Sequence, residues 1–120
     1  MDSSARVAQL AADFAFAVRA QNNAIADHDS VAGNAWALKY SAAAKELLKQ
    51  DKEGLEAFSE LLADTRIDVR TMAAAFLIPF KTEESKRVLE ESARGCDLPA
   101  LGARIALVRW EREGRGIELI

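Results

Sequence analysis

The sequence contains few of the residues that cross-link or break a polypeptide chain. Among its 120 residues there are one cysteine, two prolines and six glycines. The lone cysteine, Cys96, excludes an intramolecular disulfide and suits a reducing cytoplasm. Because breaking residues are scarce while alanine, leucine, glutamate, lysine and arginine are plentiful, the composition favours helix over strand.

Long apolar runs and a surplus of positive charge are missing as well. Arg6, Gln9 and Asp13 interrupt the first apolar residues, so no secretory signal core forms, and no stretch approaches the ~18 unbroken apolar residues of a membrane-spanning helix. The 16 basic and 19 acidic residues leave a net charge of -3, without the positive field that attracts nucleic acid. We therefore expect a cytoplasmic protein with no membrane partner, and the charge disfavours a nucleic-acid partner.

Apolar residues recur at spacings of three and four along six segments, which predicts six helices. The predicted helices cover residues 4–27, 31–50, 55–63, 69–79, 82–94 and 97–114. Their short connections make sequential helices antiparallel neighbours. We therefore expect one all-α domain of stacked antiparallel hairpins over residues 1–120, with an N-terminal helical hairpin (1–50), two helix pairs (51–114) and a tail (115–120).

Polar residues at the helix starts predict how the helices are capped. Asp29 or Ser30 is placed to cap the second helix, Asp68 the fourth, Thr82 the fifth and Asp97 the sixth, because their side chains can accept a hydrogen bond from a free backbone amide. Residues 51–54 are predicted to be the turn between the second and third helices.

Large apolar residues predict which helix faces are buried. Trp36 and Tyr40 are expected to lie in the core rather than to form a ligand platform, because aromatic rings gain most from burial. On the sixth helix the predicted buried stripe is Leu101, Ile105 and Val108, extended by Trp110.

One stretch of the chain reads Leu61-Leu62-Ala63-Asp64-Thr65-Arg66-Ile67-Asp68-Val69-Arg70 and continues with Ala73, Ala74 and Leu77. This stretch resembles the inter-helix turn and inner helix of a HEAT repeat. The resemblance implies that Asp64, Asp68, Val69 and Arg70 are structural residues of a repeat turn, in which an aspartate and an arginine help to fix the angle between paired helices. A second copy, which lacks the Val-Arg pair, runs from Ser85 to Leu107.

The order of features over most of the chain is also similar to a bacterial family known as domain of unknown function 2019. The shared features are a first helix that ends before Asp27-His28-Asp29, the residues Asp51-Lys52-Glu53-Gly54, the Asp68-Val69-Arg70 turn, and a closing Leu107-Val108-Arg109-Trp110-Glu111 before Gly114. The resemblance implies a compact HEAT-like fold and brings no established activity and no catalytic residue.

The residues that could carry chemistry are isolated. His28 is the only histidine, which excludes a multi-histidine metal cage. Asp27 and Asp29 could join His28 on a metal, but a solvated turn between helices is the favoured interpretation. Cys96 has no histidine near it in sequence, so a loop cysteine is favoured over a nucleophile.

Two acidic pairs, Glu83-Glu84 and Glu90-Glu91, do not change this interpretation. Adjacent helical residues point about 100° apart, so neither pair converges on one atom, and a solvated face is the simpler interpretation. We expect no enzyme activity, no cofactor and no metal.

Basic residues gather on the last helix. Arg104, Arg109 and Arg112, together with Trp110, form a candidate partner-contact surface with an aromatic anchor and a charged rim. The favoured interpretation is nevertheless that these arginines are solvated or pair with the acid-rich fifth helix, because exposed arginines contribute little to binding on average.

The leading functional hypothesis is a non-catalytic protein-binding module or adaptor, because stacked hairpins present a continuous concave surface, here lined by the second, fourth and sixth helices. By analogy, such a module includes the neutralising (immunity-type) partner of a toxin. The alternative is a HEAT-like nucleic-acid-binding or processing protein, which needs a basic concave groove and which duplex binding at low salt would support. A third hypothesis is a self-associating structural unit.

Overall fold

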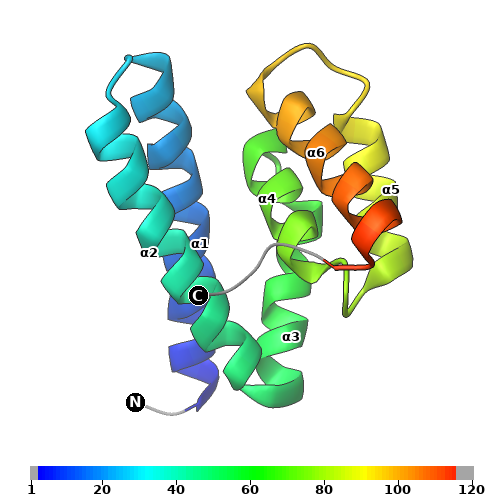
Figure 1. Cartoon of the computed structure of the whole chain (residues 1–120). Helices are drawn as coiled ribbons and strands as arrows, with labels where there is room; N and C mark the ends of the chain where they lie inside the picture. The colour runs from blue at the N-terminus through cyan, green and yellow to red at the C-terminus, as the bar shows by residue number, and fades with distance from the viewer. Residues whose placement is uncertain (1–2, 116–120) are drawn as a thin grey trace. The chain divides into compact units, whose positions relative to one another are not determined.

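The computed structural model describes residues 3–115, which are helical apart from short connections (Figure 1). In chain order the elements are α1 (Ser3–Ala26), α2 (Ser30–Lys49), α3 (Asp51–Glu60), the 3-10 helix η1 (Leu61–Ala63), α4 (Ile67–Leu77), α5 (Thr82–Ser92) and α6 (Leu98–Glu113). No strand occurs among the described residues. The predicted all-α class is therefore confirmed. The predicted tail, residues 115–120, lies outside the described range except for Arg115.

Contacts divide the chain into two compact units, and the boundary falls between Phe58 and Ser59. The first unit holds α1, α2 and most of α3, and the second holds η1, α4, α5 and α6. This boundary differs from the predicted grouping into residues 1–50 and 51–114, which placed α3 with the second half. The assignment of the whole chain to one domain stays a prediction.

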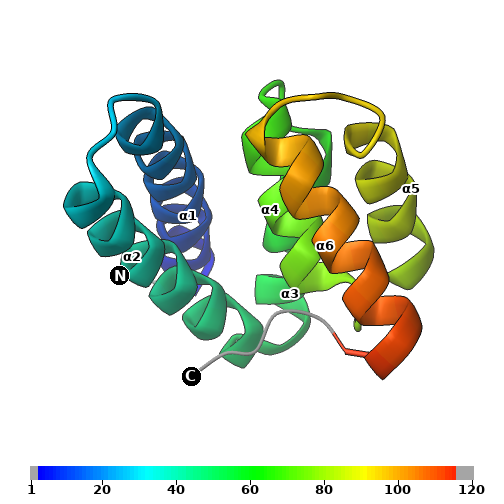
Figure 2. The same ribbon diagram turned by 45° about the horizontal axis from the view of Figure 1, so that its top comes forward.

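In the first unit, α1 and α2 lie side by side as an antiparallel hairpin (Figures 1 and 2). α1 ends in a Schellman motif, in which His28 has a φ of 60° and the Asp29 N–H donates to the Ala24 carbonyl at 2.8 Å. The Asp29 carboxylate then accepts from the Ala32 N–H at 3.0 Å and caps α2, which confirms the predicted cap. These bonds satisfy both helix ends within one short connection.

Aromatic rings form the centre of the first unit's core. The fully buried Phe14 packs edge-on against Tyr40 and Phe58, with 5.9 and 4.8 Å between ring centroids. Further buried residues of these helices are Val7, Ala15, Ala17, Val18, Ala43, Ala44 and Leu47. Burial raises the pKa of the Tyr40 hydroxyl above its usual value of 10.0. Tyr40 thus takes its predicted core position, whereas Trp36 is only half-buried.

A glycine allows α3 to begin close against the end of α2. The chain reverses at Asp51, whose φ is 56°. A Cβ on Gly54 would overlap the carbonyl oxygen of Leu47 and lie 2.8 Å from the Cβ of Gln50, so only glycine permits this close approach. The prediction of a turn over residues 51–54 is wrong, because they form the first turn of α3.

In the second unit, α4, α5 and α6 all contact one another, and Figure 2 shows α6 lying across α4 and α5. All but two of the residues from Val69 to Ile78 are buried, so α4 has little surface left to line the predicted concave face. The helix ends at Leu77, two residues before Pro79, which has no backbone N–H to donate, whereas the predicted range ran to residue 79.

The caps of the second unit match the prediction at one helix of three. Asp97 caps α6 by accepting from the Ala100 N–H at 3.0 Å, which confirms the prediction. Asp68 and Thr82 do not cap, because α4 and α5 begin one residue before Asp68 and at Thr82 itself. The predictions for these two residues are therefore wrong.

α5 contributes two serines to the buried interior of the second unit. The hydroxyls of Ser92 and Thr71 lie 2.7 Å apart and form a buried hydrogen bond between α5 and α4. Ser85 is fully buried, and its hydroxyl has no hydrogen-bond partner among the described residues. A buried hydroxyl without a partner destabilises the folded state.

The fully buried residues of α6 are alanines, whereas its large apolar residues are half-buried or exposed. Ala100 and Ala103 are 0% exposed, whereas the predicted buried residues Leu101, Ile105 and Val108 are 50, 52 and 48% exposed. The predicted buried face of this helix is wrong. The physical reason is that the helix has two apolar faces, and the small side chains of one let the backbone of α6 approach its neighbours closely.

Candidate functional site

The exposed large apolar residues of α6 form one continuous face. Leu98, Leu101, Ile105 and Val108 follow one another at spacings of three, four and three residues, which places them on one side of a helix. Their exposed fractions are 44, 50, 52 and 48%. We call these four residues the α6 stripe. Isolated exposed apolar residues are common in soluble proteins, whereas an aligned row of them makes this face a candidate contact surface.

Two arginines extend the α6 stripe toward the end of the helix. Arg112 continues the spacing four residues after Val108, and Arg109 lies on the neighbouring flank. Within residues 3–115 neither guanidinium has an ion pair or a hydrogen bond. Both positive charges are thus available to an acidic ligand that covers the stripe.

Arg104, another predicted contact residue, holds α6 in place. Its Nη1 atom donates to the carbonyl of Ala93 at 2.8 Å and to that of Gly95 at 3.1 Å, and so ties α6 to the end of α5. Carbonyl acceptors satisfy its donors without cancelling its charge. Arg104 therefore adds positive charge on the opposite flank of the α6 stripe from Arg109.

Trp110 is separated from the other predicted contact residues. Successive helical residues advance by about 100°, which puts Trp110 roughly opposite the centre of the α6 stripe. Its side chain is half-buried. The predicted surface of Arg104, Arg109, Trp110 and Arg112 is thus divided, with the arginines around the stripe and the tryptophan on the far side of the helix.

Gly102 lies between Leu101 and Ile105 in sequence, at one edge of the α6 stripe. A Cβ on Gly102 would have no neighbouring atom within 4 Å. Glycine inside a helix costs roughly 1 kcal/mol relative to alanine, and no described neighbour requires it here. Gly102 leaves the backbone accessible beside the stripe, where another helix could approach closely.

The predicted repeat-turn residues lie at the connection between η1 and α4, where Asp64 follows η1, and in the first turn of α4, which holds Asp68, Val69 and Arg70. Arg70 Nη1 donates to the carbonyls of Asp64 at 2.8 Å and Thr65 at 3.2 Å. The Asp64 carboxylate accepts from the Arg66 N–H at 2.9 Å. Arg70 therefore holds this connection through two of its backbone carbonyls.

Asp68 pairs with an arginine of the same turn. The Asp68 carboxylate is 7% exposed and accepts two hydrogen bonds from Arg66, at 3.0 and 2.8 Å, and one from the Val69 N–H at 2.9 Å. The side-chain hydrogen bond to Asp68 raises the pKa of Arg66. The Asp68–Arg66 pair thus braces the start of α4.

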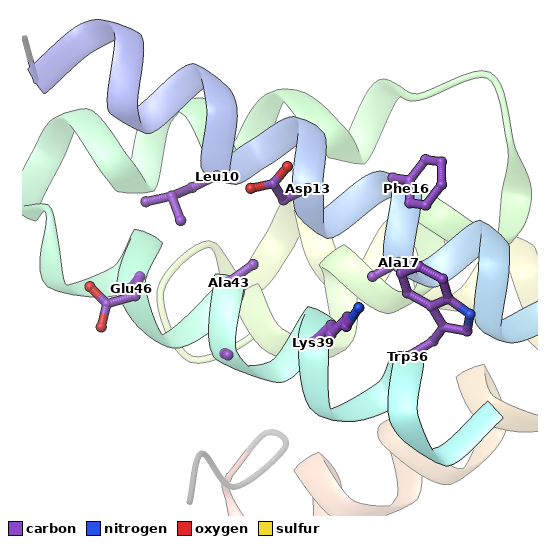
Figure 3. A pocket seen from close by; sticks show the side chains of 9 residues that line it. Leu10, Asp13, Phe16, Ala17, Trp36, Lys39, Ala43 and Glu46 are labelled. Atoms are coloured by element: carbon purple, nitrogen blue, oxygen red, sulfur yellow. The ribbon is translucent and has the colours of Figure 1, made fainter. Parts of the chain in front are cut away.

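A second candidate surface is a groove between α1 and α2 in the first unit (Figure 3). The groove has a volume of about 440 Å³ and an apolar floor that includes Leu10, Ala17 and Ala43. At one end Phe16 and Trp36 meet edge to face, with 5.5 Å between ring centroids.

The charged groups around this groove are already engaged. Lys39 Nζ lies 4.5 Å from the centroid of the Trp36 ring. Asp13 accepts a hydrogen bond from Gln9 at 2.8 Å, and Glu46 lies 3.6 Å from both Arg6 and Lys49. Each of the charged groups at the groove thus has a neighbouring partner, whereas Arg109 and Arg112 beside the α6 stripe have none among the described residues.

The remaining candidates for chemistry do not form a cluster within either unit. His28 is exposed at the end of α1, Cys96 is exposed in the connection before α6, and the two belong to different units. The side chains of the two acidic pairs of α5 are exposed. Over residues 3–115, no group of three or more histidine, cysteine, aspartate or glutamate side chains could hold a metal ion.

Comparisons with protein-family models, with curated proteins and with solved structures found no match. None of the described helices combines the length and the apolar character that crossing a membrane requires.

Sequence reasoning missed the α6 stripe as a surface although its signal is present in the sequence. The alanines at positions 100 and 103 form a second apolar face, and the large residues of the stripe are followed on their own side by Arg109 and Arg112. An apolar helix face that ends in unpaired charged residues is better suited to exposure than to burial in a core.

Proposed function

We propose that this protein is a cytoplasmic, non-catalytic protein-binding module or adaptor whose contact surface is the α6 stripe. The observation that carries the proposal is the row of four large apolar side chains, each about half exposed, which ends beside two unpaired arginines. Apolar centres with arginine at the rim are typical of protein–protein contacts. Adaptors and toxin-neutralising proteins both act through such a surface, so the proposal covers either role.

The way α6 is held supports this proposal. Ala100 and Ala103 are fully buried, and Arg104 bonds to the end of α5, so the opposite face is presented on a fixed helix. A surface that is already ordered loses less conformational entropy when a partner binds.

Nucleic acid is the less suitable partner on the same observations. The net charge is -3, and the apolar side chains of the α6 stripe would contribute little to binding a phosphate backbone. Arg109 and Arg112 are two positive charges beside a hydrophobic row, which suits a protein with matching apolar residues.

The proposed relation to HEAT-like repeats rests on the turn between η1 and α4. Arg70 and the Asp68–Arg66 pair brace this connection, and a braced helix-to-helix angle is what lets repeats stack in register. The partner-binding proposal does not depend on this relation.

Affinity capture with matched variants tests the proposed function. The wild-type protein, Ile105→Glu and Leu38→Glu would each be immobilised and exposed to extract of the native host. Leu38 is 74% exposed on α2 in the first unit, so it is a control for adding a charge at an exposed apolar position. We expect the wild type and Leu38→Glu to retain a common protein and Ile105→Glu to lose it.

Circular dichroism melts must show that both variants are folded. Retention of the same protein by Ile105→Glu would refute the α6 stripe as the contact surface. Absence of any protein enriched by the wild type would count against a binding function.

A further inference from the structure

We propose that a second copy of this chain docks on the exposed face of α2, so that the two α2 helices pair antiparallel about a two-fold axis. The inference uses a surface other than the α6 stripe and goes beyond the proposed function. It is argued from the sizes of the side chains on this face and from the charges at its two ends.

α2 carries an uncovered apolar row. Val31, Ala35, Leu38 and Ala42 follow one another at intervals of four, three and four residues, which places them on one side of the helix. Val31 and Leu38 are 81 and 74% exposed, and both alanines are exposed as well. The buried residues of α2 lie on the opposite side. We call the four exposed residues the α2 seam.

Large and small residues alternate along the α2 seam, which makes it complementary to itself. When two α2 helices run antiparallel about a point between residues 36 and 37, Leu38 of each copy faces Ala35 of the other, and Val31 of each copy faces Ala42. Each layer then holds one large and one small side chain, the arrangement in which facing residues interdigitate. A parallel pairing would instead place alanine against alanine and leave those layers underfilled.

The two ends of the α2 seam carry opposite charges. Lys45 continues the line of the seam three residues after Ala42. The antiparallel pairing brings it to the α1–α2 connection of the second copy, which holds Asp27 and Asp29. Within residues 3–115 neither the Lys45 ammonium nor the Asp27 carboxylate has an ion pair or a hydrogen bond. Two equivalent contacts between opposite charges thus close the ends of the seam.

The other charged residues near these ends leave the match intact. Glu46 lies 3.6 Å from both Lys49 and Arg6, so with Lys45 there are three positive charges and one negative charge at this end. At the other end, His28 is the only further ionisable residue of the connection. One end of the seam is therefore net positive and the other net negative.

No like charges meet along the flanks of the α2 seam. On one flank Asn34 lies opposite Ser41 of the second copy, and both side chains are neutral. On the other flank Lys39 lies opposite Ala32 of the second copy. The Lys39 ammonium is held 4.5 Å from the centroid of the Trp36 ring, beside the groove between α1 and α2 (Figure 3). The flanks thus permit the pairing that the seam and its ends favour.

Sedimentation velocity of the full chain at rising concentration tests the inference. We expect a monomer–dimer equilibrium with a dissociation constant on the order of 0.1 mM, because the contact is short. Leu38→Glu should abolish the dimer, whereas Ile105→Glu, the matched control on α6, should leave it unchanged. A wild-type protein that stays monomeric up to about 1 mM would overturn the inference. So would a dimer that is lost in Ile105→Glu and kept in Leu38→Glu, because the second copy would then occupy the α6 stripe.

Exchanging large and small residues tests the pairing of the layers. Ala35→Leu should weaken self-association several-fold, because it puts two leucines into one layer. Ala35→Leu/Leu38→Ala should restore it, because the large and small side chains then exchange places. Stronger association of Ala35→Leu would indicate a parallel pairing and refute the antiparallel one.

Charge reversal tests the ends of the seam. Lys45→Glu should weaken self-association, and Lys45→Glu/Asp27→Lys should recover it. The difference between these variants should shrink as salt is raised. Failure of the double variant to recover association would refute the antiparallel register.

The affinity capture separates this inference from the proposed function. A second copy of this chain should be retained by the wild type and by Ile105→Glu but not by Leu38→Glu. A ligand of the α6 stripe should show the reverse dependence on these two variants. Circular dichroism melts must again show that every variant is folded, and an unfolded Leu38→Glu would place the α2 seam in a core and overturn the inference.

Discussion

Gly54 and Gly102 both lie inside helices, and the same substitution to alanine should change stability in opposite directions. We expect Gly102→Ala to raise the free energy of unfolding and Gly54→Ala to lower it. Alanine is favoured over glycine inside a helix by roughly 1 kcal/mol at either position. The sign is therefore decided by what the new Cβ atom would meet.

At position 102 the Cβ meets no atom within 4 Å, so the whole gain of about 1 kcal/mol should remain. At position 54 it would overlap the Leu47 carbonyl oxygen and lie 2.8 Å from the Gln50 Cβ. Because the overlapped atom belongs to the backbone, the start of α3 must move away from α2, which disturbs the packing of Phe58 on Phe14. Overpacking costs about 1–3 kcal/mol, and an overlap with a backbone atom belongs to the upper part of that range, so after the helix gain of about 1 kcal/mol the net loss should be about 1–2 kcal/mol.

Equilibrium urea unfolding followed by far-ultraviolet circular dichroism measures both changes. The two variants should differ by about 2–3 kcal/mol, with Gly102→Ala above the wild type and Gly54→Ala below it. A Gly54→Ala protein as stable as the wild type would show that the two helix ends do not approach as described. Destabilisation by Gly102→Ala would show that the outer side of α6 is covered.

Three other changes test separate features of the structure. His28→Gly should raise the free energy of unfolding by about 1 kcal/mol, because glycine adopts the left-handed conformation without the strain of a side chain; an unchanged value would contradict the Schellman motif. Ser85→Ala should raise the free energy of unfolding, because it removes a buried hydroxyl that has no partner among the described residues. Ser92→Ala should lower the free energy of unfolding by about 1 kcal/mol, because it removes the hydrogen bond to Thr71. Equal effects of the two substitutions would refute the assigned roles. Tyr40→Phe tests alkaline stability: burial raises the pKa of Tyr40 in the folded state, so the unfolded chain loses this proton first and wild-type stability should fall above pH 10.0. Urea titrations across this range should show a smaller fall in Tyr40→Phe, and parallel curves would contradict the burial of this hydroxyl.

The sequence predicted the helices better than their contacts. Local chemistry determines where several helices begin or end. Asp29 caps the start of α2, Pro79 lacks the amide that would continue α4, and Gly114 ends α6 with a φ of 66°. Each of these effects depends on only one or two residues. The left-handed His28 could not be predicted, since its position is normally taken by glycine. Gly54 was predicted to lie in a turn, although it lies in a helix. What requires glycine there is the close approach of Leu47 from the preceding helix, which the residues next to Gly54 in sequence do not reveal.

The candidate surface was predicted in part, and the reason lies in the size of side chains. Assigning burial by hydrophobic size selects leucine, isoleucine and valine for the core. In α6, however, the buried residues are Ala100 and Ala103. A core of small residues buries less apolar area, but it lets the helices approach one another closely. Arg109 and Arg112 were identified from their charge, but their relation to the α6 stripe depends on which face is outward.

The outward placement of the α6 stripe separates the residues needed for stability from those available for binding. Placing a charge on a buried isoleucine would destabilise the protein severely, because the charge would lose its hydration. Ile105 is 52% exposed, so a glutamate there remains hydrated and the fold should tolerate it. Ile105→Glu is thus a test of the face itself: a folded variant with an unchanged melting temperature agrees with a free surface, and an unfolded one would place the stripe in a core.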